Sequence, residues 1–206
     1  MRMTPSAERL GVFGGTFDPP HLGHLVLAEA AADHLGLARV LFVPAGAPPH
    51  KEASAVRAGA DHRLAMTRLA IASNPRFALA RTDIDRPGPH YTVDMLRLLR
   101  DEHPRSDLVL LVGGDSLRDL PTWSRPQELI ALASLGVLRR PADDLDLAAL
   151  ERAIPGLAAR VEWIPAPRLD IASSAIAAAI AAGRSVRYLV PDAVLAYIEA
   201  HGLYKE

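Results

Sequence analysis

A glycine turn between an apolar run and two closely spaced histidines is the feature that most constrains this chain. The apolar run spans residues 10–13, and Gly14-Gly15 follow it directly. The run predicts a buried strand, and the glycines let the backbone turn tightly and approach a ligand without side-chain obstruction. Pro19-Pro20 then predict the first turn of a helix, where the missing N–H of proline costs nothing.

His21 and His24 are three residues apart at the start of that helix, so both imidazoles share one face. Free N–H groups and the positive end of the helix dipole point to the same place. The glycine spacings of dinucleotide folds and of Walker loops are absent, and glycines alone would fit a structural turn. The two histidines, with Thr16 and Asp18 beside them, favour a phosphate site.

The stretch Gly-Gly-Thr-Phe-Asp-Pro-Pro-His-Leu-Gly-His at 14–24 resembles the signature of the nucleotidylyltransferase superfamily. Its extended form is similar to that of bacterial nicotinate-nucleotide adenylyltransferases. The resemblance implies that the His-x-Gly-His element binds a nucleoside triphosphate, with His21 and His24 as the catalytic residues. The ATP contacts that it implies are Gly14, Gly15, Thr16, Phe17, His21, His24, Ser173 and Ser174.

Composition narrows the class of protein. A chain of 206 residues suits one α/β domain with a real core, so we expect a single domain over 1–206. The net charge of −1 argues against nucleic-acid binding, and the absence of cysteine excludes disulfides and thiolate metal sites. Residues 1–10 lack the apolar region of a signal peptide, and the longest apolar run, 175–182, is well short of the ~20 residues of a membrane span. We therefore expect a soluble, cytoplasmic protein.

Strand and helix signals alternate along the chain and predict one doubly wound, Rossmann-like α/β domain with a mostly parallel sheet. Asp61, Thr92 and the serines at 173–174 are predicted as helix N-caps. The first and fourth strands should be neighbours at the point where strand order reverses. The predicted strands are 10–13, 40–43, 77–80, 107–112, 135–138 and 161–164, and the predicted helices are 21–35, 61–73, 92–102, 143–154, 173–182 and 192–201.

Asp115 and Trp123 are the strongest candidates for the second substrate. Asp115 follows the strand at 107–112 and fits a site for ribose hydroxyls, although a helix cap would also explain it. Trp123 lies in Leu-Pro-Thr-Trp-Ser, where the resembled family places an aromatic ring that stacks on the pyridine. Trp163 reads as a structural strand residue. The contacts to nicotinate mononucleotide that the resemblance implies are Gly15, Lys51, Thr92, Asp115, Trp123 and Ser124.

The segment 171–177 departs from the family pattern Ile-Ser-Ser-Thr-x-Ile-Arg. Ala172 replaces a serine, Ser174 a threonine, and Ala177 stands where the family has arginine. A guanidinium is the natural bidentate partner of a triphosphate, and alanine supplies nothing comparable. Either another cation reaches the same oxygens, or ATP binding is weakened. The candidates are Arg140, Arg184 and Arg187.

The resemblance implies adenylyl transfer from ATP to nicotinate mononucleotide, giving deamido-NAD and pyrophosphate. Mg²⁺ is expected to arrive with ATP, with no tightly bound cofactor and no metal site made by the protein. Nicotinamide mononucleotide or phosphopantetheine as acceptor stays an alternative. A nucleotide-binding paralogue without catalysis is another, because of Ala177. A homo-oligomeric state is left open.

Overall fold

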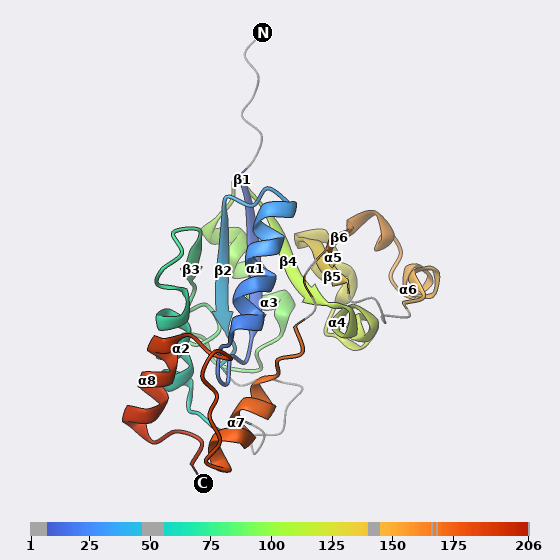
Figure 1. The fold of residues 1–206 in the computed structure, drawn as a ribbon. Coiled ribbons are helices and arrows are strands. Elements are labelled where there is room, and N and C mark those ends of the chain that lie inside the picture. Colours follow the sequence, from blue (N-terminus) through green and yellow to red (C-terminus); the bar gives the residue numbers. More distant parts are fainter. Residues whose placement is uncertain (1–7, 47–55, 140–144, 166, 168, 206) are drawn as a thin grey trace.

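One parallel sheet of six strands forms the centre of the computed structural model, which describes residues 8–46, 56–139, 145–165, 167 and 169–205 (Figure 1). Every neighbouring pair of strands is parallel. The order β3-β2-β1-β4-β5-β6 confirms the predicted Rossmann-like α/β fold. The strands are β1 (Glu8–Gly15), β2 (Arg39–Pro44), β3 (Phe77–Leu79), β4 (Ser106–Gly113), β5 (Ser134–Arg139) and β6 (Val161–Pro165).

Helices cover both faces of the sheet. One apolar cluster packs α1, α2, α7 and α8 against one face, and a second packs α3, α4, α5 and α6 against the other. Successive strand residues alternate between the clusters, with Phe13 in the first and Val12 in the second, as the pleat requires. The helices are α1 (Leu22–His34), α2 (Ala60–Ile71), α3 (Thr92–Glu102), α4 (Gly114–Asp119), α5 (Pro126–Leu132), α6 (Leu147–Ala153), α7 (Ser173–Ala181) and α8 (Asp192–His201), with short 3-10 helices η2 (Leu120–Thr122) and η3 (Ala158–Arg160).

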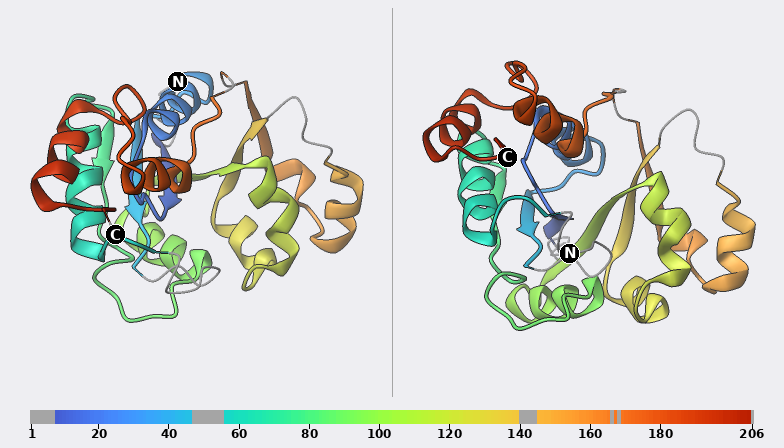
Figure 2. Two further views of the ribbon diagram at one scale, coloured as in Figure 1. Left: turned by 60° about the horizontal axis from the view of Figure 1, so that its bottom comes forward. Right: turned by 90° about the horizontal axis from the view of Figure 1, so that it is seen from below.

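The strand order reverses between β1 and β4. These strands are neighbours in register, with Leu10 opposite Leu108 and Val12 opposite Leu110. From this pair, β2 and β3 extend to one side and β5 and β6 to the other. In such sheets ligands bind beyond the carboxyl ends of the strands at the reversal. The right-hand view of Figure 2 looks onto this end of the molecule, which is the lower end in Figure 1.

Several helix starts differ from the predictions. Pro19 and Pro20 precede the N-cap residue His21, so they do not open the helix as expected. Gly59 is the N-cap of α2, Tyr91 of α3 and Ala172 of α7, and no side-chain cap bond is made at any of them. The predicted caps at 61, 92 and 173–174 were therefore wrong. In α6, by contrast, Asp146 accepts from the N–H of Ala149 at 2.9 Å.

Two helices, α4 and α5, were not predicted. They span only six and seven residues, too few for a helical period to stand out from the sequence. Among the helices that the structure describes, none combines the length and apolar character needed to cross a membrane.

Candidate functional site

Residues 14–20, which we call the signature turn, connect β1 to α1. Phe17 has a left-handed φ of 51° and is only 1% exposed. Its ring fills the space beside Gly15, where a Cβ atom would lie 2.9 Å from Phe17 Cζ. Gly15 is therefore required by packing inside the turn. At Gly14, which is exposed, the nearest atoms to an added Cβ are those of Met95 at 4.0 Å, so a ligand can approach the backbone there.

The two histidines form a stacked pair at the start of α1. Their ring centroids lie 3.7 Å apart with 26° between the planes. The backbone N–H of His21 donates to His24 Nδ1 at 3.1 Å. Because Nδ1 accepts this bond, a neutral His24 ring carries its proton on Nε2. His24 is thus held as a donor of fixed tautomer in the first turn of α1, where the sequence places it.

His21 is uncharged near neutral pH. Its side chain is 6% exposed, and burial lowers its pKa from 6.5 to about 4. Its Nδ1 is buried and has no hydrogen-bond partner among the residues that the structure describes. A neutral His21 can therefore donate one N–H to a phosphate oxygen but does not bring a positive charge to it.

We expect the free energy of unfolding to fall as the pH is lowered from about 6.5 to about 4. In that window an unfolded His21 binds a proton that the folded, buried ring rejects, so stability rises with pH and levels off above about 7. The full effect is about 3 kcal/mol. Urea unfolding at pH 7, 6 and 5 covers about 2 kcal/mol of this effect, and His21→Gln should flatten the dependence over that range by about that amount. Equal slopes for both proteins would contradict the assignment.

Asp18 connects the signature turn to two distant parts of the chain. Its carboxylate is buried and accepts from the N–H groups of Arg57 at 2.8 Å and Ala58 at 3.2 Å. It also accepts from the hydroxyl of Tyr204, near the end of the chain, at 2.6 Å. Burial and the neighbouring carboxylate raise the pKa of Tyr204 well above its ordinary value, so the hydroxyl stays a donor.

Arg63 on α2 fixes the backbone around the turn. Its side chain is 1% exposed, and burial lowers its pKa from the ordinary value. The guanidinium donates to four backbone carbonyls, those of Thr16 (2.9 Å), Ala45 (2.7 Å), Gly46 (2.8 Å) and Ala58 (3.2 Å). Sequence reasoning missed Arg63 and the partner of Tyr204. One signal was present: position 63 continues the buried face of α2 at 66, 67 and 70, where an arginine needs partners.

The N-terminus of α7 lies against the signature turn. The Ser173 hydroxyl donates to the Pro19 carbonyl at 2.9 Å, which brings these segments together as predicted. Ser174 is exposed at the same helix end. Ala177 is 1% exposed and belongs to the first apolar cluster, so a small side chain suits its surroundings.

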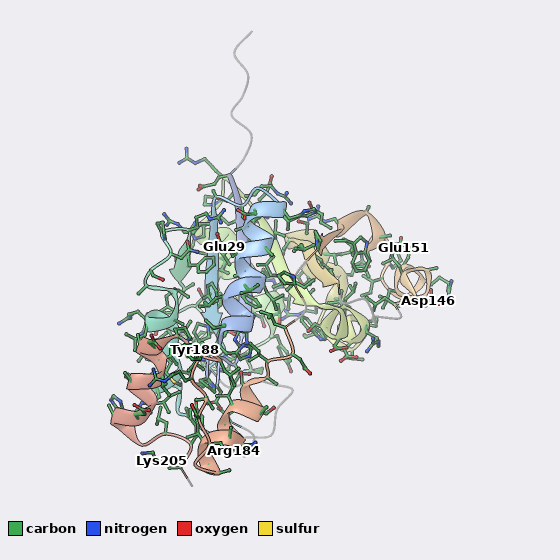
Figure 3. The ribbon with its side chains drawn as sticks, viewed as in Figure 1. Glu29, Asp146, Glu151, Arg184, Tyr188 and Lys205 are labelled. Atoms are coloured by element: carbon green, nitrogen blue, oxygen red, sulfur yellow. The ribbon has the colours of Figure 1, made fainter. Side chains whose placement is uncertain are left out.

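The cations considered for the missing arginine are not equivalent. Arg184 is exposed just beyond the C-terminal end of α7, and Ser173 is at the other end of that helix; Figure 3 labels Arg184. Arg187 is exposed in the segment whose Leu189 carbonyl accepts from the N–H of Leu22, the first residue of α1, at 2.9 Å. Arg140 lies outside the described residues. Sequence reasoning did not consider Arg57, which is exposed and whose own N–H binds Asp18.

The candidates for the second substrate lie on the other face of the sheet. Asp115 is exposed in the first turn of α4 and pairs with Arg118 at 3.2 Å; Gly113 is the N-cap, so the cap explanation of Asp115 fails. Trp123 follows η2 and packs half-buried against the second apolar cluster. Trp163, a residue of β6, packs against the same cluster, as a structural residue should.

The other residues predicted to contact nicotinate mononucleotide have less distinctive surroundings. Thr92 is the first residue of α3, and Ser124 lies between η2 and α5; both are half-buried. Lys51 lies outside the described residues. Among the described candidates, Ser173 therefore lies on the side of the first apolar cluster and Trp123 on the side of the second, whereas Gly15 of the signature turn belongs to both predicted sets. In the described part of the chain, no group of three or more metal-ligating side chains is placed to hold an ion.

Comparison with known proteins decides the family. Residues 12–179 match the family model described as cytidylyltransferase-like. The chain belongs to the cytidylyltransferase-like family. Among its relatives is a probable nicotinate-nucleotide adenylyltransferase of Thermomicrobium roseum, 51% identical over 198 residues, which are 96% of this chain and 92% of that protein. A second of the same description, from Roseiflexus sp., is 48% identical over 200 residues, 97% of this chain and all of that protein.

A solved structure of this cytidylyltransferase-like fold has the same architecture. The Plasmodium falciparum nicotinic acid mononucleotide adenylyltransferase complexed with NaAD superposes with a TM-score of 0.77 at 18% identity, covering 96% of this chain and 97% of that one. At that identity the likeness concerns the fold. The relatives at about half identity confirm the resemblance to nicotinate-nucleotide adenylyltransferases that the signature predicts.

Proposed function

We propose that this cytidylyltransferase-like protein transfers the adenylyl group of ATP to nicotinate mononucleotide, giving deamido-NAD and pyrophosphate. The observation that carries the proposal is the stacked pair of His21 and His24 at the start of α1, beside an open glycine backbone. It lies in a chain that is 51% identical to a probable nicotinate-nucleotide adenylyltransferase.

The reaction needs positioning and charge stabilisation more than a protein nucleophile. The phosphate of the acceptor is itself nucleophilic, so it can attack the α-phosphorus of ATP while pyrophosphate leaves. The enzyme must hold the attacking and leaving oxygens in line and stabilise the charge on the phosphates. His24 would donate from Nε2, and the backbone N–H groups of 14–17 with the N-terminus of α1 would add further donors.

Positive charge at the triphosphate must come from groups other than His21, which is neutral near pH 7. ATP would enter as its Mg²⁺ complex, with the ion held chiefly by phosphate oxygens. Arg187 is the best placed of the described alternatives to the missing arginine, because its segment is hydrogen-bonded to the first residue of α1. Arg57, beside Asp18, is the second. Serines 173 and 174 would complete the ATP side.

Nicotinate mononucleotide would bind beside ATP at the carboxyl ends of β1 and β4, on the side of the second apolar cluster. Trp123 would stack on the pyridine ring, the backbone near Ser124 would read its carboxylate, and Asp115 would accept from ribose hydroxyls. Thr92, Gly15 and Lys51 would complete this set.

Replacing Trp123 by leucine should raise the KM for nicotinate mononucleotide about tenfold and leave the KM for ATP unchanged, because ring stacking is lost while the side chain stays apolar. Steady-state kinetics with each substrate varied in turn measures the effect. Trp163→Leu is the matched control, since that ring packs half-buried on β6. An unchanged KM for the acceptor would remove Trp123 from the site.

The function itself is tested by pyrophosphate release from ATP and Mg²⁺ with three acceptors in parallel. Fast release of pyrophosphate with nicotinate mononucleotide supports the proposal. It would also mean that another group takes the place of the arginine that the family has at position 177. Faster release with nicotinamide mononucleotide or phosphopantetheine would reassign the acceptor. Nucleotide binding without release in any arm would identify a non-catalytic paralogue.

A further inference from the structure

Distant parts of the chain bind oxygen atoms of the signature turn. Arg63 of α2 binds the Thr16 carbonyl from 47 positions away, and Ser173 of α7 binds the Pro19 carbonyl from 154 positions away. Tyr204 binds the Asp18 carboxylate from 186 positions away. The turn therefore takes its shape from elements far along the sequence.

Tyr204 reaches Asp18 because the chain folds back after α8. The N–H of Leu203 binds the carbonyl of Ile198, and Tyr204 itself has a left-handed φ of 66°. Its side chain is 7% exposed, and its oxygen lies 4.0 Å from Met66 Sδ on α2. The end of the chain thus lies at the lower end of the molecule, where Lys205 is labelled, at the same end as the carboxyl edge of the sheet (Figure 3).

The turn needs such support because its central residue is strained. Phe17 adopts a left-handed backbone without being glycine, a conformation that persists only where the surroundings impose it. Asp18 is the next residue, so its anchoring helps to fix the direction of the peptide groups at 14–17. Those groups are the donors assigned above to the triphosphate.

We infer that Tyr204 is a positioning residue of the ATP site, acting through the Asp18 carboxylate on the backbone of the signature turn. The inference rests on the proposed function, which places ATP at that turn. It assigns to the last described residues of the chain a part in substrate binding, with no contact between Tyr204 and the nucleotide.

The test compares Tyr204→Phe with Tyr197→Phe. The first removes the hydroxyl that binds Asp18 and keeps the buried ring. The second removes a hydroxyl on α8 that binds His62 Nδ1 of α2 at 3.0 Å, and so loosens the same region without touching the turn. At a temperature where circular dichroism shows both variants folded, Tyr204→Phe should lower kcat/KM for ATP roughly ten- to hundredfold. The KM for nicotinate mononucleotide should stay near the wild-type value, and Tyr197→Phe should match the wild type.

A double-mutant cycle with Asp18→Asn checks that the effect passes through this bond. If it does, the double variant is no worse than the more affected single variant; independent effects would multiply and overturn the inference. Wild-type kinetics for folded Tyr204→Phe would also overturn it, leaving Tyr204 a purely structural residue.

Affinity for a non-hydrolysable ATP analogue separates this inference from the proposed function. A wild type that binds the analogue but transfers to no acceptor would defeat the proposed reaction, and the loss of analogue affinity in Tyr204→Phe would still support the positioning role. A wild type that binds no analogue would overturn both.

Discussion

Alanine at position 24 is expected to lower the turnover of adenylyl transfer at least about tenfold while the fold persists. His24 is held by the N–H of His21 on one side of its ring, stacks on the His21 ring, and meets the edge of Phe17 with centroids 5.0 Å apart. A donor fixed in tautomer and orientation before the substrate binds needs no reorganisation in the transition state. Its loss should therefore appear in kcat, measured by pyrophosphate release at saturating substrates.

Two companion variants separate this chemistry from the stability of the helix. His24→Ala also removes the acceptor for the N–H of the N-cap residue, which costs about 1 kcal/mol. Glutamine at this third helical position can restore that bond, so His24→Gln should recover stability but not the wild-type rate. His34→Ala, at the exposed far end of α1, should leave turnover unchanged. Turnover near the wild-type value in His24→Ala would remove this ring from the mechanism.

The parts of the site that could be predicted are those whose signals are local. The strand, glycine turn and paired histidines occupy one short stretch, and chain spacing alone places His21 and His24 on one helical face. The alternation of strands and helices predicts a doubly wound parallel sheet, in which the first and fourth strands are neighbours where the strand order reverses. The pairing of β1 with β4 confirms that prediction.

The parts of the site that could not be predicted are side chains whose hydrogen-bond partners lie far away in the sequence, or side chains that could bind either of two partners. Nothing near Asp18 in the sequence indicates that its carboxylate binds Tyr204. Ser173 looked like a helix cap, but its hydroxyl binds the Pro19 carbonyl instead. The Ser173 hydroxyl could bind either the backbone of its own helix or a distant carbonyl, and the sequence indicates only the first of these.

The departure at Ala177 takes on a different meaning in the fold. Because this residue is buried in an apolar cluster, alanine is well suited to the position whatever becomes of the triphosphate contact. The cation that binds the triphosphate would then be Arg187, whose segment contacts α1 through the Leu189 carbonyl. The loss of one cation from α7 is thus compatible with an intact site, provided that a neighbouring segment supplies another.

Replacing the buried Arg63 by methionine is expected to lower the free energy of unfolding by about 3 kcal/mol or more, the largest effect on stability that we expect from one substitution. The guanidinium donates to four backbone carbonyls that belong to the signature turn, the end of β2 and the approach to α2. Methionine keeps the apolar stem but leaves those carbonyls without their donor, and it removes the positive charge that faces the buried Asp18. Urea unfolding followed by circular dichroism at pH 7.5 measures the loss.

Arg68→Met on the same helix is the matched control, because that side chain is exposed; its effect should stay within about 0.5 kcal/mol. Arg63→Lys should fall between the two, since one ammonium group cannot reproduce the planar fork that reaches carbonyls on both sides. A free energy of unfolding for Arg63→Met within about 1 kcal/mol of the wild-type value would mean that the four carbonyls bind water or other donors instead. Arg63 would then not determine the shape of the turn. A large loss, with the lysine variant intermediate, would mean that the geometry of the fold and that of the phosphate turn depend on the same buried side chain.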